Sequence, residues 1–153
     1  MPIKEIPTLT RKTFIPRGTT ALLDAIGLTL HEASTQAVPE TKEAKVTVVI
    51  ITDGHENSSE TYNKDQVFDL IRKLEKDHNW QFVFLGANQD AIEEAQHLGI
   101  AKERALNFTS DKEGALNMFI DLSHNITLSV NECRPLAFTK EQREKQKRNP
   151  KQS

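Results

Sequence analysis

Residues 45–52 read K-V-T-V-V-I-I-T, and this stretch decides the fold class of the chain. Its residues are mostly β-branched, and its apolar character is almost continuous. A strand that is covered on both faces in a parallel sheet has this composition, whereas a half-exposed strand alternates apolar and polar residues. Asp53 and Gly54 follow as a turn signal, so the sequence predicts a buried strand that ends at Asp53.

Helices are predicted on both sides of this strand in the sequence. Apolar residues recur at helical spacing over residues 19–33 and again over residues 64–78, which is typical of helices with one buried face. A second buried strand, W-Q-F-V-F-L, is expected over residues 80–85. A third, shorter strand is expected over residues 104–108.

Two more helices are predicted in the second half of the chain. One is a short helix over residues 88–98, with Asn88 as its N-cap. The other spans residues 112–131, with Ser110 as its N-cap. Three large apolar residues of this longer helix are expected to face the core: Leu116, Phe119 and Ile120.

Strands that alternate with helices along the chain predict an α/β fold. We expect a Rossmann-like, doubly wound and mainly parallel sheet of about three strands with flanking helices. In such sheets, ligands bind outside the carboxyl ends of the strands. Asp53 and Gly86 both follow such ends, so a functional site is expected there.

The composition fits one soluble domain. The chain has 153 residues, of which 37% are hydrophobic and 27% charged, which is enough for a single core. No apolar run approaches the ~20 residues of a membrane-spanning helix, and the N-terminus lacks the apolar core of a signal peptide. The single cysteine, Cys133, excludes an internal disulfide framework and a four-cysteine zinc site. We therefore expect a cytoplasmic protein without a membrane partner.

The net charge of −2 conceals an uneven distribution. Residues 134–153 carry seven Lys or Arg and two Glu, so the rest of the chain is acidic. An acidic body is not typical of a nucleic-acid-binding domain, so no nucleic-acid partner is expected. The predicted organisation is an irregular segment over residues 1–18, one domain over residues 19–133, and a basic, disordered tail over residues 134–153.

Two oxygen-bearing side chains are expected at the carboxyl end of the sheet. Thr20 opens the first predicted helix, and Asp53 ends the first predicted strand. Hydroxyl and carboxylate oxygens are hard ligands that suit Mg²⁺ or Mn²⁺. Each residue alone has a simpler interpretation, Thr20 as a helix N-cap and Asp53 as part of an Asp-Gly turn. Their combination at one edge of the sheet predicts that Thr20 and Asp53 are metal ligands. The next three residues, His55, Glu56 and Asn57, are interpreted as a solvated loop.

Segments around these residues resemble motifs of von Willebrand factor A domains. Residues 16–27 (PRGTTALLDAIG) and 48–59 (VVIITDGHENSS) are similar to the second and third metal-site motifs of that family. The likeness is to its intracellular bacterial and phage members. Residues 80–100 (WQFVFLGANQDAIEEAQHLGI) resemble the strand and helix that follow in that subgroup, and the resemblance covers about residues 14–122.

The resemblance implies a fold, a function and a site. Members of the family fold as a Rossmann-like sheet flanked by helices. They usually bind protein ligands through a metal-ion-dependent adhesion site and are not enzymes. By the same resemblance, Thr20 corresponds to the metal-coordinating threonine, and Asp53 to the aspartate that approaches the metal, usually through water. We therefore expect a non-enzymatic module that binds a protein ligand.

The chain departs from the family at its first motif. That motif, Asp-x-Ser-x-Ser at the end of the central strand, supplies most of the metal ligands, and this chain contains no such sequence. Thr20 and Asp53 would supply two of about six oxygen ligands, so Mg²⁺ or Mn²⁺ is expected to bind weakly or not at all. The chain is expected to be a truncated domain. A missing central strand favours association with an upstream domain half or self-association.

The position of Asp53 is also consistent with a second function. Asp53 at the end of a buried strand is also the position of the acceptor or metal ligand in a Mg²⁺-dependent phosphoryl-transfer or receiver-like domain. Such a domain needs an acidic pair after an earlier strand, and the earlier acidic residues Glu5 and Asp24 are poorly placed for this. A purely structural or assembly role is the third possibility.

Overall fold

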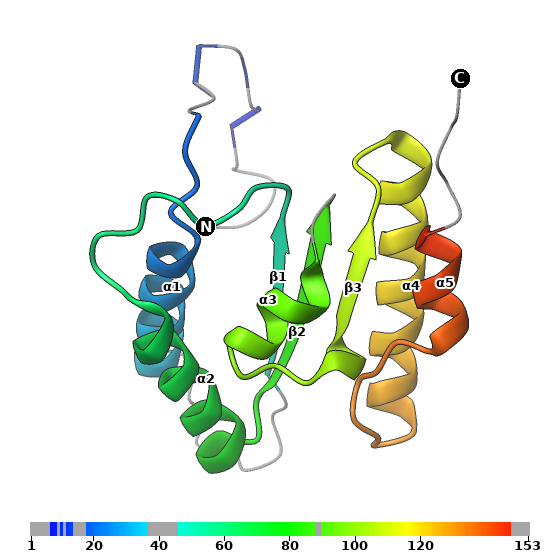
Figure 1. The fold of residues 1–153 in the computed structure, drawn as a ribbon. Coiled ribbons are helices and arrows are strands. Elements are labelled where there is room, and N and C mark those ends of the chain that lie inside the picture. The colour runs from blue at the N-terminus through cyan, green and yellow to red at the C-terminus, as the bar shows by residue number, and fades with distance from the viewer. Residues whose placement is uncertain are drawn as a thin grey trace.

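The computed structural model describes residues 7–8, 10, 12–13, 18–36, 46–87 and 90–147. Helices alternate with short strands along this part of the chain (Figure 1). The elements in order are α1 (Leu22–Gln36), β1 (Thr47–Thr52), α2 (Lys64–His78), β2 (Gln81–Ala87), α3 (Ala91–His97), the 3-10 turn η2 (Lys102–Arg104), β3 (Ala105–Phe108), α4 (Lys112–Asn131) and α5 (Lys140–Lys147). The predicted alternation is confirmed, and α2 and α4 begin and end at the expected residues.

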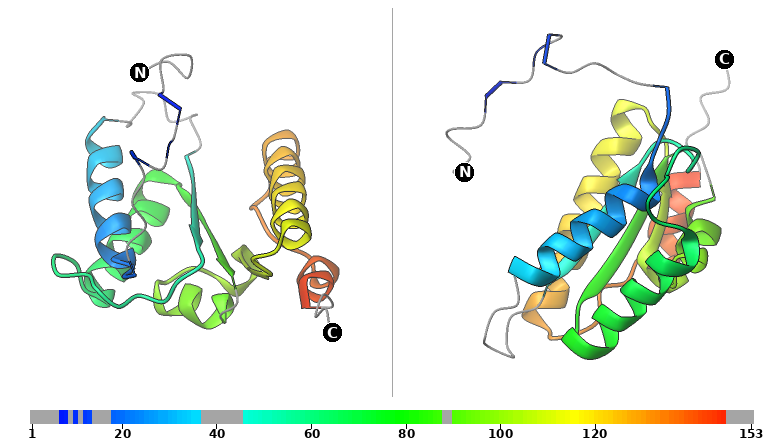
Figure 2. Two further views of the ribbon diagram at one scale, coloured as in Figure 1. Left: turned by 90° about the horizontal axis from the view of Figure 1, so that it is seen from above. Right: turned by 90° about the vertical axis from the view of Figure 1, so that its left-hand side faces the viewer.

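The three strands form one parallel sheet in the order β1-β2-β3. The pairing of β1 with β2 runs in register from Thr47 opposite Gln81 to Thr52 opposite Gly86. β3 pairs with the last four residues of β2. α1, α2 and α3 cover one face of the sheet, whereas α4 and α5 lie on the other (Figure 2). The fold is therefore α/β and Rossmann-like, with helices on both faces of a parallel sheet, as the sequence predicts.

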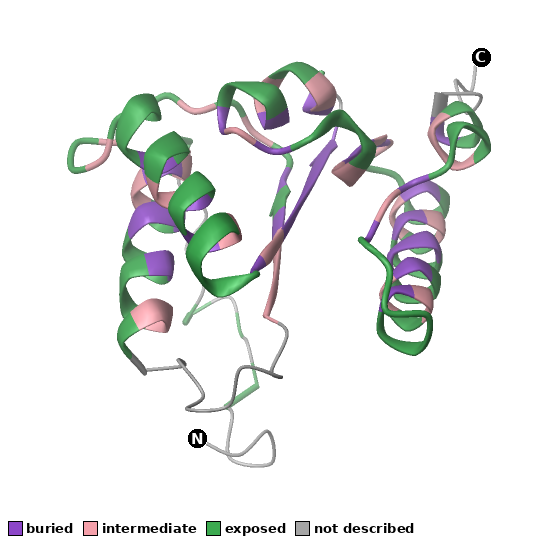
Figure 3. Ribbon diagram, turned by 90° about the horizontal axis from the view of Figure 1, so that it is seen from below, coloured by how far each residue is buried: buried purple, intermediate pink, exposed green. Residues whose placement is uncertain are grey.

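β2 divides the hydrophobic core into two halves, because successive side chains of a strand point to opposite faces. Phe82 and Phe84 are buried with residues of α1, α2 and α3, whereas Val83 and Leu85 are buried with residues of α4. β2 is accordingly buried along almost its whole length (Figure 3). The helices complete the first half with Leu23, Ile26, Leu30, Val67, Ile71 and Leu74. The second half is completed by Leu106, Phe108, Met118, Leu122, Leu136 and Phe138.

β1 is less buried than its composition predicts. Ile50 is buried in the first half of the core, but Ile51, on the opposite face, is 46% exposed. The expectation that this strand is covered on both faces is therefore wrong at Ile51, whereas Val49 on the same face is partly buried against the second half of the core. The reason is that β1 is an edge strand of the described sheet and α4 packs against β3 instead.

α4 turns a different face toward the core than the sequence predicts. Met118 and Leu122 are buried against the sheet. Leu116, Phe119 and Ile120, which were expected inside, are 57%, 55% and 53% exposed. The prediction is wrong because the helix carries apolar residues on two sides. The side that packs on the sheet includes buried polar residues near the end of the helix, so apolar periodicity does not mark it.

The N-caps of two helices also differ from the prediction. Asp111, and not Ser110, caps α4, and its carboxylate accepts a hydrogen bond from the Gly114 N–H at 2.8 Å. Asp90 caps α3, whereas the expected cap, Asn88, lies outside the described residues. An aspartate at these positions adds a favourable charge interaction with the helix N-terminus to the hydrogen bond.

The C-terminal region is folded against the sheet over residues 134–147, where the sequence predicts a disordered tail. Leu136 and Phe138 are 1% and 2% exposed. The Phe138 N–H donates to the Glu103 carbonyl at 2.7 Å, and α5 follows. The prediction is wrong because two apolar residues suffice to anchor an otherwise polar segment. Residues 148–153, and most of the predicted irregular segment before residue 18, lie outside the described residues.

Candidate functional site

β1 ends in a tight turn that presents Asp53 to solvent. The Thr52 hydroxyl donates a hydrogen bond to the Gly54 carbonyl at 2.8 Å and accepts one from the Gly54 N–H at 3.2 Å. Thr52 is buried, so the turn is anchored in the core. Asp53 is exposed between these two residues, whose hydrogen bonds hold the backbone of the turn.

The loop after β1 is held against the start of α1. The Thr20 N–H donates to Asn57 Oδ1 at 2.8 Å, and the Asn57 N–H donates to the Thr20 carbonyl at 3.1 Å. The Asp24 N–H donates to the Ser59 hydroxyl at 3.0 Å. These bonds join segments that are 37 and 35 residues apart in the sequence, and they place the N-terminus of α1 beside the carboxyl end of β1.

The Glu56 carboxylate is the centre of this loop. One oxygen accepts hydrogen bonds from the Leu23 N–H at 2.8 Å and the Ser59 hydroxyl at 2.7 Å. The other accepts from the N–H groups of Ser58 and Ser59 at 2.9 and 2.8 Å. Burial alone raises the pKa of Glu56, but these hydrogen bonds, led by the one from Leu23, lower that pKa to about 2. Because the Leu23 N–H belongs to the first turn of α1, Glu56 also caps this helix.

A second carboxylate, that of Asp24, holds the end of the same loop. It accepts hydrogen bonds from the N–H groups of Glu60, Thr61 and Tyr62 at 2.9, 2.9 and 2.7 Å. The bond from Glu60 has the largest effect, and the three together outweigh burial and a nearby like charge, so the pKa of Asp24 is lowered. The Tyr62 ring lies over Gly27, where a side chain would collide with it.

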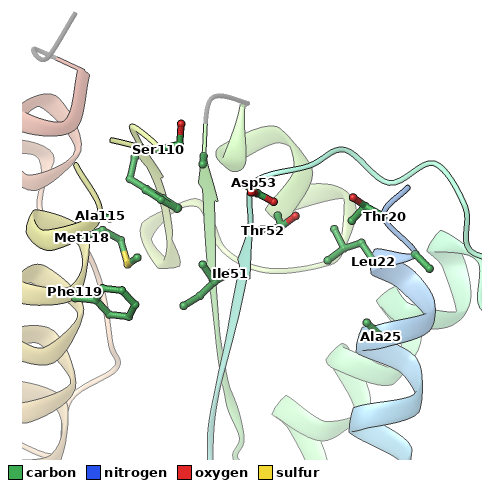
Figure 4. A pocket seen from close by; sticks show the side chains of 13 residues that line it. Thr20, Leu22, Ala25, Ile51, Thr52, Asp53, Ser110, Ala115, Met118 and Phe119 are labelled. Atoms are coloured by element: carbon green, nitrogen blue, oxygen red, sulfur yellow. The ribbon is translucent and has the colours of Figure 1, made fainter. Parts of the chain in front are cut away.

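The Thr20 hydroxyl lies directly against the turn after β1. A Cβ atom at Gly54 would be 2.5 Å from Thr20 Oγ1, so glycine is needed for this approach. Because Gly54 follows Asp53, the hydroxyl and the carboxylate lie at the same end of the sheet (Figure 4). The structure therefore brings together the two residues that the sequence singles out, while their role as metal ligands stays a prediction.

Thr20 and Asp53 stand at the rim of a groove of about 620 Å³. α1 forms one wall, α4 forms the other, and β1 lies between them (Figure 4). Most of the lining is apolar and includes Leu22, Ala25, Ile51, Met118 and Phe119. Asp53 is the one charged residue among the described residues that line it. Such a groove suits a ligand that is apolar along most of its length and polar or positively charged at one end.

The donor set fits a divalent cation only in part. Mg²⁺ and Mn²⁺ take about six oxygen ligands, and Thr20 and Asp53 would supply two. Asp24 of α1 and Glu56 of the loop after β1 each already accept several backbone hydrogen bonds. Within the ranges that the structure describes, no three His, Cys, Asp or Glu residues are grouped so that they could hold a metal ion. A cation here would therefore need most of its ligands from water or from a partner.

Sequence reasoning missed the residues that hold the site together. The interpretation of residues 55–57 as a solvated loop is wrong for Glu56, which is half-buried, and incomplete for Asn57, which is exposed but bonded to Thr20. Only His55 fits it without qualification. The carboxylate of Glu56 binds amides from two segments that are far apart in the sequence. No local sequence pattern predicts such an arrangement.

No family model, curated protein or solved structure matches the chain. No helix within the described residues has the combination of length and apolar character that crossing a bilayer requires.

Proposed function

We propose that this chain is a non-enzymatic protein-binding module that resembles a von Willebrand factor A domain with an incomplete metal-ion-dependent adhesion site. The observation that carries the proposal is the groove beside β1 with Thr20 and Asp53 at its rim. Ile51 and Phe119 line this groove and are 46% and 55% exposed. Large apolar side chains that share one exposed groove are typical of a protein interaction site. A cytoplasmic location is part of the same proposal.

The chemistry of the surrounding loop favours binding over catalysis. A general acid or base works best with a pKa near the operating pH. The pKa of Glu56 is instead lowered to about 2, and that of Asp24 is also lowered, because both carboxylates accept several hydrogen bonds. Both groups therefore stay ionised near neutral pH and hold the loop in place, which supports a rigid recognition site.

A photo-crosslinking experiment tests this function. A photoreactive amino acid replaces Ile51 in the full chain, and the matched control replaces Leu28, which is 56% exposed and does not line the groove. We expect a discrete crosslinked protein partner from position 51 and not from position 28. Equal labelling from both positions, or none from position 51, would contradict the proposal.

Two further measurements address the metal and the alternative function. Calorimetric titration with Mn²⁺ or Mg²⁺ should show weak binding or none in the isolated chain. If a partner completes the site, crosslinking at position 51 should increase with Mn²⁺ and lose this increase in Asp53→Asn. Incubation with acetyl phosphate tests the receiver-like alternative, since an adduct that disappears in Asp53→Asn would favour phosphoryl transfer.

A further inference from the structure

The outer edge of β1 presents backbone groups that no described strand pairs with. The Val46 carbonyl accepts a hydrogen bond from the Gln81 N–H at 2.9 Å, so the backbone of Val46 points toward β2. Successive residues of a strand direct their N–H and C=O groups to opposite sides. The backbone groups of Thr47, Val49 and Ile51 therefore point away from β2. β1 is the terminal strand of the described sheet, which leaves this side open.

This edge lacks the features that usually protect an edge strand. Natural edges are blunted by proline, lysine, inward-pointing charges, bulges or very short strands. β1 has six residues, T-V-V-I-I-T, with no proline and no charge. Its pairing with β2 continues in regular register from end to end. Such a strand has the composition and geometry of an interior strand, which would be paired on both sides.

α1 and α4 flank this open edge and leave a slot between them. Leu22 and Ala25 of α1 form one wall, and Met118 and Phe119 of α4 form the other, with Ile51 between the walls (Figure 4). A strand carries side chains on two faces. Each face of a strand in this slot would meet one of the two walls, and its backbone would meet the free edge of β1. A helix, whose backbone groups bond internally, would leave that edge unpaired.

We propose that an extended, apolar segment of another polypeptide adds to β1 as a fourth strand in this slot. This inference rests on the proposed protein-binding function and specifies how the partner binds. Charge complementarity constrains the segment, because the lining carries one charge among its described residues, that of Asp53 at the carboxyl end of β1. The segment is therefore uncharged along the slot and carries a Lys or Arg at the end beside Asp53.

A second copy of the chain fits the slot less well. The β1 strand of that copy also lies between its own α1 and α4. When two such edges are brought together, the helices of both copies compete for the space on each face of the joined sheet. An extended segment brings no helices of its own, so it can approach the edge without this conflict.

A synthetic peptide provides the first test. The probe is a short peptide of alternating Val and Ala, apolar on both faces, with a terminal Lys, and it is N-methylated at every second residue so that only one edge can pair. The control peptide is N-methylated at every residue, so it has no backbone N–H donor and methyl groups obstruct both of its edges. We expect the probe to bind the full chain with a Kd on the order of 10 μM by fluorescence anisotropy, and the control at least tenfold more weakly. Equal affinity of the two peptides, or no binding of the probe at millimolar concentration, overturns the proposal.

Variants of the chain locate the binding. Ile51→Lys places a charge in the slot and should weaken probe binding at least tenfold, whereas Leu28→Lys should leave it unchanged. Val49→Pro removes an N–H from the open edge without removing a bond to β2, so it should abolish binding. Circular dichroism checks that each variant folds. Unchanged affinity of a folded Ile51→Lys variant overturns the proposal even where Val49→Pro does not fold.

Sedimentation and crosslinking distinguish the other candidate occupants of the slot from an extended segment. A dimer of the unmodified chain that Ile51→Lys dissociates would assign the slot to a second copy and overturn the proposal. A partner that crosslinks at position 51 while the probe fails to bind would leave the protein-binding function standing and remove strand addition alone. A monomer that binds the probe supports strand addition.

Discussion

The two edges of the sheet differ in how far they are covered. At β3, the chain after α4 returns to the sheet, where Leu136 and Phe138 are buried and α5 lies against the strand. Leu106 in β3 is fully buried as a result. At β1, no described strand pairs with the outer edge, and Ile51 is 46% exposed. The longer of the two edge strands, with six residues against four, is thus the one left open.

The difference shows that the two sides of the domain are stabilised by different interactions. Buried apolar side chains hold the β3 side together. The carboxyl end of β1 depends instead on hydrogen bonds from the loop after it, centred on Glu56 and Asp24. A loop held in this way fixes the end of β1 without covering the groove beside it, where we propose that a partner binds.

The largest loss of stability is expected when a side chain that covers β3 is removed. Phe138→Ala should lower the free energy of unfolding by about 3–5 kcal/mol, because the ring is 2% exposed and its removal leaves a cavity. Phe119→Ala on the β1 side removes the same atoms from a residue that is 55% exposed and should cost less than about 1 kcal/mol. Urea denaturation of both variants measures the difference. Equal losses of unfolding free energy in the two variants would mean that the β1 and β3 sides of the sheet are equally covered.

An intermediate effect is expected from the loop that holds the β1 side. Glu56→Gln should lower the free energy of unfolding by about 2 kcal/mol at neutral pH, because a charged acceptor of several hydrogen bonds is lost. The pKa of Glu56 is lowered from 4.5 to about 2 on folding, so its contribution is complete above pH 4.5 and is lost as the pH falls toward 2.

The pH dependence of the stability of Glu56→Gln tests whether the Glu56 carboxylate holds the loop. Urea unfolding between pH 2 and pH 6 should show a smaller loss of stability toward low pH in Glu56→Gln than in the unmodified chain. Glu60→Gln, at an exposed position in the same loop, is the matched control and should keep the original pH dependence. A Glu56→Gln variant with an unchanged acid transition would show that this carboxylate does not hold the loop.

The smallest expected effect tests how closely Thr20 approaches the end of β1. Gly54→Ala should lower the free energy of unfolding by about 1 kcal/mol, because the new Cβ would lie 2.5 Å from Thr20 Oγ1 and the hydroxyl must move. In a Thr20→Ala background the same substitution should cost almost nothing. A double-mutant cycle by thermal unfolding measures this coupling. If the losses of stability caused by the two substitutions were simply additive, Thr20 and Gly54 would not be in contact.

Local patterns predicted the helices and strands well. α2 matches its expected bounds because Val67, Ile71 and Leu74 form one buried stripe, and because Asn63 and Gln66 form a capping box at its start. The meeting of Thr20 with the end of β1 also followed from the sequence, since both were expected at the carboxyl end of one parallel sheet.

What the sequence could not predict depends on long-range contacts. The exposed side of α4 is as apolar as its buried side, so only the position of the sheet decides that Phe119 faces the groove. Glu56 holds the site through amides from another part of the chain, which no spacing rule marks. The cover over β3 depends on Leu136 and Phe138, two apolar residues in a region whose composition suggests disorder.

The segment that covers β3 is synthesised after the strand itself. β3 ends at Phe108, but Phe138, which closes its edge, is translated about 30 residues later. At roughly 5–20 residues per second, the nascent sheet has both of its edges uncovered for about 2–6 seconds. The emerging chain is then most exposed to intermolecular strand pairing, so this interval is when protection by a chaperone would matter most.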